Sequence, residues 1–381
     1  MLPKLFVLAA VALSAVNAQT GKFQFKETYP DSGSIPKPKP EWMELLKNAN
    51  ITKAPVLKAN GDDGPQQKGS ADPYCDWTFT GCTRDTDIVE CPKGQWGITY
   101  DDGPTEFSPA LYDFLDKTQQ KSTLFMIGGQ VVRFPDLTLR AYKSGHELAM
   151  HTWSHSYMTT LTNEQLVAEL KWNELAIKEV TGVSPRFFRP PYGDIDDRVR
   201  DVAKALGFTP VIWNHDTDDW KAGESTSFKT EWIDSNVTSW AAEAKNAKVG
   251  GISLEHDLYK VTVDAAIRVL PTLQKAYKVT TVGQCVGQQS YKEGNGAVAN
   301  ATTTAAASTT TAASTTTAAP STTANPAGSS QASSSAASSG AAGASNAAQQ
   351  SGDQKPTNAG NHLTATGAGL ALAVAASYLL A

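Results

Sequence analysis

Short apolar runs alternate with longer amphipathic segments between residues 97 and 282, and this alternation limits the folds open to the chain. The apolar runs are typical of buried strands and fall at 97–100, 123–127, 147–150, 187–188, 210–213, 252–254 and 279–282. The amphipathic segments are typical of helices and fall at 108–118, 130–144, 162–181, 198–206, 227–246 and 261–277. Strands that alternate with helices predict an α/β fold with a parallel sheet and right-handed crossovers. About seven such units favour an incomplete (β/α) barrel, with a doubly wound open sheet as the alternative.

Charge marks where this folded domain ends. The chain has 33 Lys and Arg and 38 Asp and Glu, and only Asp353 and Lys355 lie beyond residue 293. The remainder of that tail is mostly Ala, Ser, Thr and Gly, which bury too little apolar area to offset chain entropy. We therefore expect one folded domain over 75–291, after an extended Pro-, Gly- and Lys-rich segment over 19–74 to which no chemistry is assigned. A net charge of −5 argues against a nucleic-acid partner.

The two ends of the sequence predict that the protein is located outside the cytosol. Residues 1–18 resemble a secretory signal, with Lys4 before an apolar stretch and small residues at 16–18. The apolar end from residue 367 is short for a membrane span, and small-residue triplets precede it. This pattern indicates a glycosylphosphatidylinositol (GPI) signal over 358–381, removed on attachment, with Asn358 favoured over Ser351 as the attachment site. The alternative is a plain Ala-rich tail.

The Ser/Thr/Ala-rich stretch over 297–357 is typical of an O-glycosylated stalk. N-glycosylation sequons occur at Asn50, Asn236 and Asn300. We therefore expect a secreted protein held at the plasma membrane by a lipid anchor, with transfer to the cell wall left open.

Four cysteines allow three pairings, and an oxidising compartment favours two disulfides. Cys75 and Cys82 are close in sequence and would enclose a short loop. Cys91 lies just before the first strong strand and Cys285 just after the last, so a bridge between them would close the domain if those strands are neighbours. A cysteine zinc site lacks support because there is no C-x-x-C pair.

Polar side chains follow five of the expected strands. They are Asp101 and Asp102, His151 with His155 four residues later, Arg189, Asp216 and Asp219, and His256. In a (β/α) barrel the ends of all these strands meet at the C-terminal face, where active sites are built. Acidic, basic and imidazole groups after five separate strands are difficult to explain as solvated loops.

Two of these segments point to a metal. The imidazoles of His151 and His155 can face one ion, although an H-x-x-x-H pair alone is a weak signal. Two histidines and one aspartate leave positions open for water and substrate, as in hydrolytic zinc sites. Asp101 and Asp102 supply adjacent carboxylates, of which one can bind metal while the other takes a proton. The alternative reading of D-D-G-P is an Asp-rich turn that caps the helix near Ser108.

The five segments together resemble a known family. They read T-Y-D-D-G (99–103), H-T-W-S-H (151–155), R-P-P-Y-G (189–193), D-T-D-D-W (216–220) and L-E-H (254–256). In this order they are similar to the five motifs of NodB-like polysaccharide deacetylases, carbohydrate esterase family 4, over roughly half the chain. The secreted, Ser/Thr-rich and anchored context looks like the fungal chitin deacetylases within that family. The resemblance implies a distorted (β/α) barrel and metal-dependent N-deacetylation.

The resemblance also implies roles, residue by residue. Metal ligands match Asp102, His151 and His155, for one divalent ion, zinc or cobalt. The proton-transfer groups match Asp101 as base with Arg189 as its partner, and His256 as acid with Asp219 as its partner. The substrate contacts match Tyr192, whose backbone N–H helps to hold the oxyanion, and Trp220 and Leu254, which line a pocket for the acetyl methyl group.

The leading hypothesis is thus a hydrolase that removes N-acetyl groups from chitin or its oligomers in the cell wall. Two alternatives stay open: a deacetylase of another acetylated polysaccharide, and a wall mannoprotein that only binds chitin. The intact set of acid, base and metal-ligand residues favours an enzyme, since a binding protein has no need of Asp101 beside Asp102.

Overall fold

The computed structural model describes residues 23–59, 64–66 and 69–294, and its strands form two parallel groups. One group has the order β2 (Thr99–Asp101), β3 (Thr123–Met126), β4 (Glu147–Met150), β5 (Phe187–Phe188) and β6 (Thr209–Pro210). The other has the order β7 (His215–Asp216), β8 (Gly251–Leu254), β1 (Gln95–Gly97) and β9 (Lys278–Thr280). A parallel bridge between Asp101 and His256 joins the two groups. The predicted parallel α/β class is confirmed.

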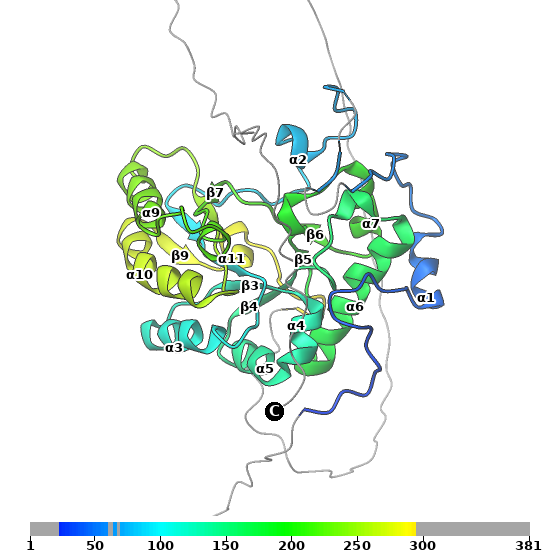
Figure 1. Cartoon of the computed structure of the whole chain (residues 1–381), viewed down its shortest axis with the longest axis horizontal. Helices are drawn as coiled ribbons and strands as arrows, with labels where there is room; N and C mark the ends of the chain where they lie inside the picture. Colours follow the sequence, from blue (N-terminus) through cyan, green and yellow to red (C-terminus); the bar gives the residue numbers. More distant parts are fainter. Residues whose placement is uncertain (1–22, 60–63, 67–68, 295–381) are drawn as a thin grey trace, which may run out of the picture. The chain divides into compact units, whose positions relative to one another are not determined.

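Helices cover the outside of these strands (Figure 1). The helices on one side of the view are α3 (Ser108–Thr118), α9 (Glu231–Glu243) and α10 (Lys260–Ala276). Those nearer the other side are α4 (Gly128–Arg133), α5 (Pro135–Lys143), α6 (Asn163–Thr181) and α7 (Asp197–Ala205). Shorter elements are α1 (Pro40–Met43), η1 (Glu44–Leu46), α2 (Trp77–Thr80), η3 (Met158–Thr160), η4 (Pro191–Gly193), α8 (Lys221–Glu224) and α11 (Val282–Val286).

Helix α6 shows why the predicted boundaries hold where local signals are strong. Thr162 is its N-cap, and its side chain and that of Gln165 form a reciprocal capping box. The helix ends at Gly182, whose φ of 86° is the left-handed conformation that glycine adopts most readily. The observed range differs from the predicted one by the N-cap residue alone.

Two predicted elements are divided in the structure and a third is shortened. The expected strand 97–100 is two strands, because Ile98 lies between β1 and β2 as the chain changes sheet. The expected helix 130–144 is α4 and α5, because Pro135 lacks an N–H and begins a new helix after Phe134. The expected strand 210–213 is shorter, because Val211 and Ile212 donate to Phe188 and Ile88 instead of extending one ladder.

Strand residues alternate between two cores. On β3 and β4, Leu124 and Leu148 pack in the larger core under the helices. Their neighbours Phe125 and Ala149 lie in a second, smaller core with Val211 and other apolar side chains. Both faces of these strands are therefore buried, which explains why the strand sequences are apolar throughout rather than alternating.

The domain contains both expected disulfides. Cys75 joins Cys82, with Cα atoms 5.0 Å apart, and Cys91 joins Cys285, with Cα atoms 5.5 Å apart. The second bridge lies beside the pair formed by β1 and β9. The first and last strands of the domain are therefore neighbours, as the predicted bridge required. No helix within the described ranges has the length and apolar character needed to cross a membrane.

Candidate active site

The residues singled out at strand ends converge at one edge of the strands. Asp101 is the last residue of β2, His151 directly follows β4, and Arg189 directly follows β5. Asp219 lies three residues after β7, and His256 lies two residues after β8. Hydrogen bonds and ion pairs connect these residues and their neighbours in three small groups.

The first group is Asp102, His151 and His155. Their potential ligand atoms all lie within 4.8 Å of one another. The Asp102 Oδ1 atom is 3.4 Å from Nε2 of His151 and 3.3 Å from Nε2 of His155. That oxygen is buried and receives no hydrogen bond, which is costly unless a cation compensates it.

The protonation of the two imidazoles suits metal coordination. His151 lies 2.9 Å from the Arg189 carbonyl through Nδ1, so Nδ1 carries the proton and Nε2 presents a lone pair. Burial lowers the pKa of His155 to about 4, despite the charge of Asp102 beside it, and keeps this ring neutral. Burial alone would raise the pKa of Asp102, but the neighbouring histidines lower it, so this group is a carboxylate. The three residues thus fit a divalent ion that prefers nitrogen and oxygen ligands.

The segment that carries the two histidines has an unusual backbone. Thr152 and His155 both have a φ of 62°, in the left-handed region that non-glycine residues seldom adopt. Two side chains of helix α6 bind this segment through its backbone. Glu169 accepts hydrogen bonds from the N–H groups of Trp153 and Ser154, and Asn173 donates to the Thr152 carbonyl.

The second group pairs Asp101 with Arg189. The Arg189 Nη1 atom donates to Asp101 Oδ1 over 2.8 Å, and both side chains are buried. Burial raises the pKa of Asp101, while Arg189 and His151 oppose that rise. The guanidinium also lies over the rings of Phe125 and Trp213, which fix its plane. Asp101 is therefore held in one orientation, with its Oδ2 atom 3.8 Å from His151 Nε2.

The third group pairs His256 with Asp219. The Asp219 carboxylate accepts from His256 Nδ1 over 2.7 Å and from the His256 backbone N–H over 2.9 Å. Burial alone would lower the pKa of His256, but the charge of Asp219 and this hydrogen bond raise it to about 10. His256 is therefore an imidazolium at neutral pH, with a proton available on Nε2.

The expected substrate contacts lie around these groups. Tyr192 belongs to η4, has a φ of 59° and is 48 % exposed, and its ring centre lies 4.7 Å from that of His155. Trp220 follows Asp219 directly and is partly buried. Leu254 is the last residue of β8 and is buried two residues before His256.

Other polar residues near the motifs have structural roles. Asp216 accepts from the Asp218 N–H within its own loop, and His215 packs against Trp96 and Trp240. His146 is buried beside Ser122. The alternative in which D-D-G-P is a turn that caps the helix near Ser108 is wrong. The N-cap of α3 is Phe107, and it makes no side-chain cap hydrogen bond.

Two supporting groups lie outside the five motifs. Glu169 and Asn173 are buried polar residues four positions apart on α6, a spacing that places both on the face toward the histidine segment. Asp257 accepts from Ser108 Oγ over 2.5 Å and lies against Gly103, where any Cβ would collide with its carboxylate. No sequence signal separates Glu169 and Asn173 from the other polar residues of α6, whereas Asp257 directly follows the L-E-H motif.

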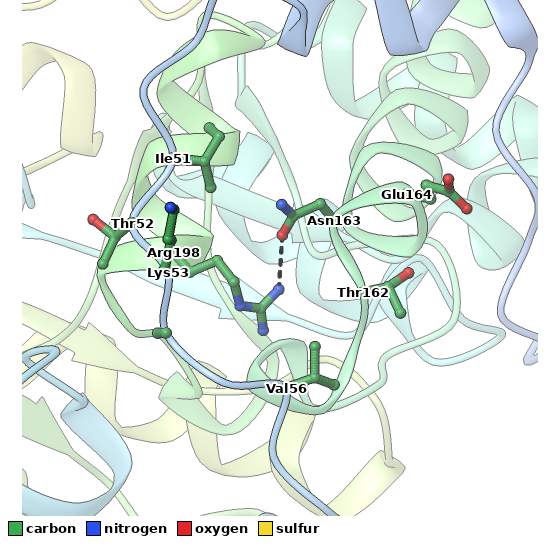
Figure 2. Close-up of a pocket in the computed structure, with 9 residues that line it drawn as sticks. Ile51, Thr52, Lys53, Val56, Thr162, Asn163, Glu164 and Arg198 are labelled. Carbon is green, nitrogen blue, oxygen red and sulfur yellow. Dashed lines mark hydrogen bonds between the residues drawn. The ribbon is translucent and has the colours of Figure 1, made fainter.

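A cavity of about 530 Å³ lies away from this site, between residues 51–56 and the start of α6 (Figure 2). Arg198 projects into it from α7 and donates to Asn163 over 3.1 Å. The cavity contains none of the strand-end residues, so it adds nothing to the chemistry above.

The modification sites expected from the sequence fall into two sets. Asn50 is exposed in the loop after η1, whereas Asn236 lies within α9 and is partly buried. Asn300, Asn358, the signal, the stalk and the anchor signal lie outside the described residues.

Comparison with known proteins gives concordant matches. Residues 89–211 match a family model described as polysaccharide deacetylase. Chitin deacetylase 1 of Cryptococcus neoformans var. grubii is 39% identical over 292 residues, covering 73% of this chain and 61% of that protein. A chitin deacetylase of Amylomyces rouxii is 42% identical over 262 residues, covering 64% of this chain and 62% of that protein. Chitin deacetylase 1 of Saccharomyces cerevisiae is 35% identical over 220 residues, covering 58% of this chain and 69% of that protein. The chain spans about three fifths of the length of the first two of these relatives.

Proposed function

Because the chain belongs to the polysaccharide deacetylase family, we propose that it removes N-acetyl groups from chitin, a β-1,4-linked N-acetylglucosamine polymer, to give chitosan and acetate. One observation carries this proposal. A buried carboxylate held by an arginine and a protonated histidine held by a carboxylate flank one cluster of potential metal ligands. Amide hydrolysis needs such a base for water and such an acid for the leaving amine.

In this proposal Asp102, His151 and His155 hold one divalent ion, zinc or cobalt. When bound, the ion supplies Lewis acidity, which polarises the acetyl carbonyl and makes water more acidic. The three side chains leave positions open for water and substrate.

Asp101 accepts the proton of the attacking water. Arg189 keeps its carboxylate in place and is itself buried between Phe125 and Trp213, so it cannot turn away. Burial raises the pKa of Asp101 and makes it a stronger base than a solvated aspartate.

His256 donates a proton to the departing amine. An amine leaves poorly as an anion, so the donor must be charged at the working pH. Asp219 keeps His256 charged by raising its pKa to about 10. The backbone N–H of Tyr192 helps to hold the oxyanion, and Trp220 and Leu254 surround the acetyl methyl group.

We propose the cellular location that the sequence predicts. The chain is secreted and tethered by a GPI anchor after loss of residues 1–18 and, within the signal over 358–381, of the residues beyond the attachment site, with a glycosylated stalk over 297–357 and a catalytic domain over 75–291. Two disulfides in the described domain are consistent with an oxidising compartment.

Leaving-group dependence tests the acid assignment. An aryl acetate ester leaves readily without protonation, so His256→Ala should lose far less activity on the ester than on an N-acetylglucosamine oligomer. Asp101→Asn should be impaired on both, because both reactions need activated water. Equal losses of His256→Ala on ester and amide would contradict the role of His256 as the acid.

A further inference from the structure

The N-terminal segment packs against the segment that carries the candidate metal ligands. We call residues 23–59 and 64–66 the N-terminal belt, and residues 151–157 the histidine loop. The belt runs along the outside of α6 and continues past α7 (Figure 1). It lies outside residues 89–211, the part matched by the family model.

The belt contacts the middle of the histidine loop through Tyr29. The Tyr29 ring stacks on Trp153 with centroids 5.7 Å apart and planes 8° apart. The Trp153 Nε1 atom donates to the Asp31 carbonyl over 3.2 Å, so the same belt turn also binds the indole edge. Tyr29 is itself anchored, because its hydroxyl donates to Glu179 of α6 over 2.8 Å. Trp153 is fully buried and lies between His151 and His155 in sequence, so its position constrains both histidines.

The belt also contacts the far end of the loop. An added Cβ on Gly64 would lie 2.8 Å from the Tyr157 ring, so the belt backbone is in contact with that ring. Tyr157 stacks on Tyr192 with centroids 3.9 Å apart, and Tyr192 in turn lies 4.7 Å from His155. The Leu57 N–H donates to the Thr159 carbonyl just beyond the loop.

The backbone of the loop explains why such support is needed. Left-handed conformations at Thr152 and His155 are unfavourable for non-glycine residues and persist only where the surroundings enforce them. Glu169 of α6 binds the loop N–H groups from inside, and the belt packs on Trp153 from outside. Groups that orient metal ligands from behind typically change metal affinity about 10–100-fold when removed.

We propose that the N-terminal belt positions the histidine loop for metal binding, with Tyr29 as its main positioning residue. This inference rests on the proposed metal role of His151 and His155. A belt that only adds stability would change the melting temperature and leave the metal site of the folded protein as it is.

The test measures metal affinity in the full-length secreted protein. The apoprotein is titrated with zinc against a chelating indicator, and the visible absorption spectrum of the cobalt form reports ligand geometry. Tyr29→Ala should bind zinc at least about tenfold more weakly and alter the cobalt spectrum. Tyr29→Phe keeps the ring on Trp153 and should retain affinity within a factor of about two. Val269→Ala is the control. It removes part of a buried side chain of α10 and leaves a cavity, so it should lower the melting temperature with zinc affinity unchanged.

A glycine pair provides a second test if Tyr29→Ala does not fold. Gly64→Ala and Gly69→Ala both place alanine at positive φ, 82° and 86°, but only the first brings a Cβ against Tyr157. Gly64→Ala should change zinc affinity or the cobalt spectrum, and Gly69→Ala should change neither.

The His155→Ala variant distinguishes the belt proposal from the proposed metal site. If His155→Ala binds zinc as tightly as the parent protein, the proposed metal site is wrong. If His155→Ala loses zinc but Tyr29→Ala, or Gly64→Ala in its place, matches the parent in affinity and spectrum, the belt proposal is overturned and the metal site stands.

Discussion

Replacing Asp219 by asparagine should lower the pH at which His256 loses the proton that it donates as the general acid. The asparagine oxygen can still accept from the His256 backbone N–H, so the change removes a charge with little change of shape. With Asp219 present the pKa of His256 is about 10, and nearly all of the imidazole is protonated at pH 8. Without it, burial disfavours the charged ring and only the more distant charges of Asp101 and Asp102 oppose burial, so the pKa should fall toward the ordinary value of about 6.5.

The size of the effect follows from the fraction protonated. A group with a pKa of 6.5 is protonated about 3% at pH 8 and about three quarters at pH 6. The loss of kcat in Asp219→Asn should therefore be about 25-fold larger at pH 8 than at pH 6. The sign follows from the raised pKa: the protonated acid is present at low pH and is lost as pH rises, earlier in the variant than in the parent.

The assay is acetate release from N-acetylglucosamine oligomers at saturating substrate from pH 5.5 to 10. Asp218→Asn is the matched control, because its partly exposed carboxylate pairs with Lys221 instead of His256. That control should keep the parent pH profile. A loss in Asp219→Asn that is the same at every pH would refute the reasoning and leave Asp219 as a purely structural partner.

Three further outcomes are expected. Asp101→Asn should lower kcat by about 10²–10⁴ with zinc still bound, as measured by kinetics and metal analysis, and parent-like kcat would exclude it as the base. Replacing both Cys91 and Cys285 by serine removes a cross-link over 194 residues and should lower the free energy of unfolding by up to about 5 kcal/mol in denaturant titrations, whereas an unchanged midpoint would argue against that bridge. Phosphatidylinositol-specific phospholipase should release active enzyme from membranes, and recovery of a peptide covering residues 370–381 from the mature protein would contradict the anchor.

The fold class and the position of the site were predictable because their signals are local. Strand ends in a parallel α/β fold point to one face, so Asp101, His151 and Arg189 could be placed together without coordinates. The bounds predicted for the helix after Thr162 were accurate because its capping box and its C-terminal glycine are specific sequence signals.

Long-range packing was not predictable in the same way. The belt reads as Pro- and Gly-rich loop, and nothing local in Tyr29 indicates that its ring stacks on Trp153, 124 positions away. Glu169 resembles an ordinary helix residue, and only the fold shows that its carboxylate binds the histidine loop. The division of 97–100 into β1 and β2 also depends on partner strands far along the chain.

Acetate release before and after metal removal tests the central claim most directly. The full chain is treated with a chelator until elemental analysis finds no metal, and acetate is measured with N-acetylglucosamine oligomers. Release should fall to the level of His155→Ala and return when zinc or cobalt is added. Undiminished acetate release by the verified metal-free protein would contradict the proposed metal-dependent deacetylation.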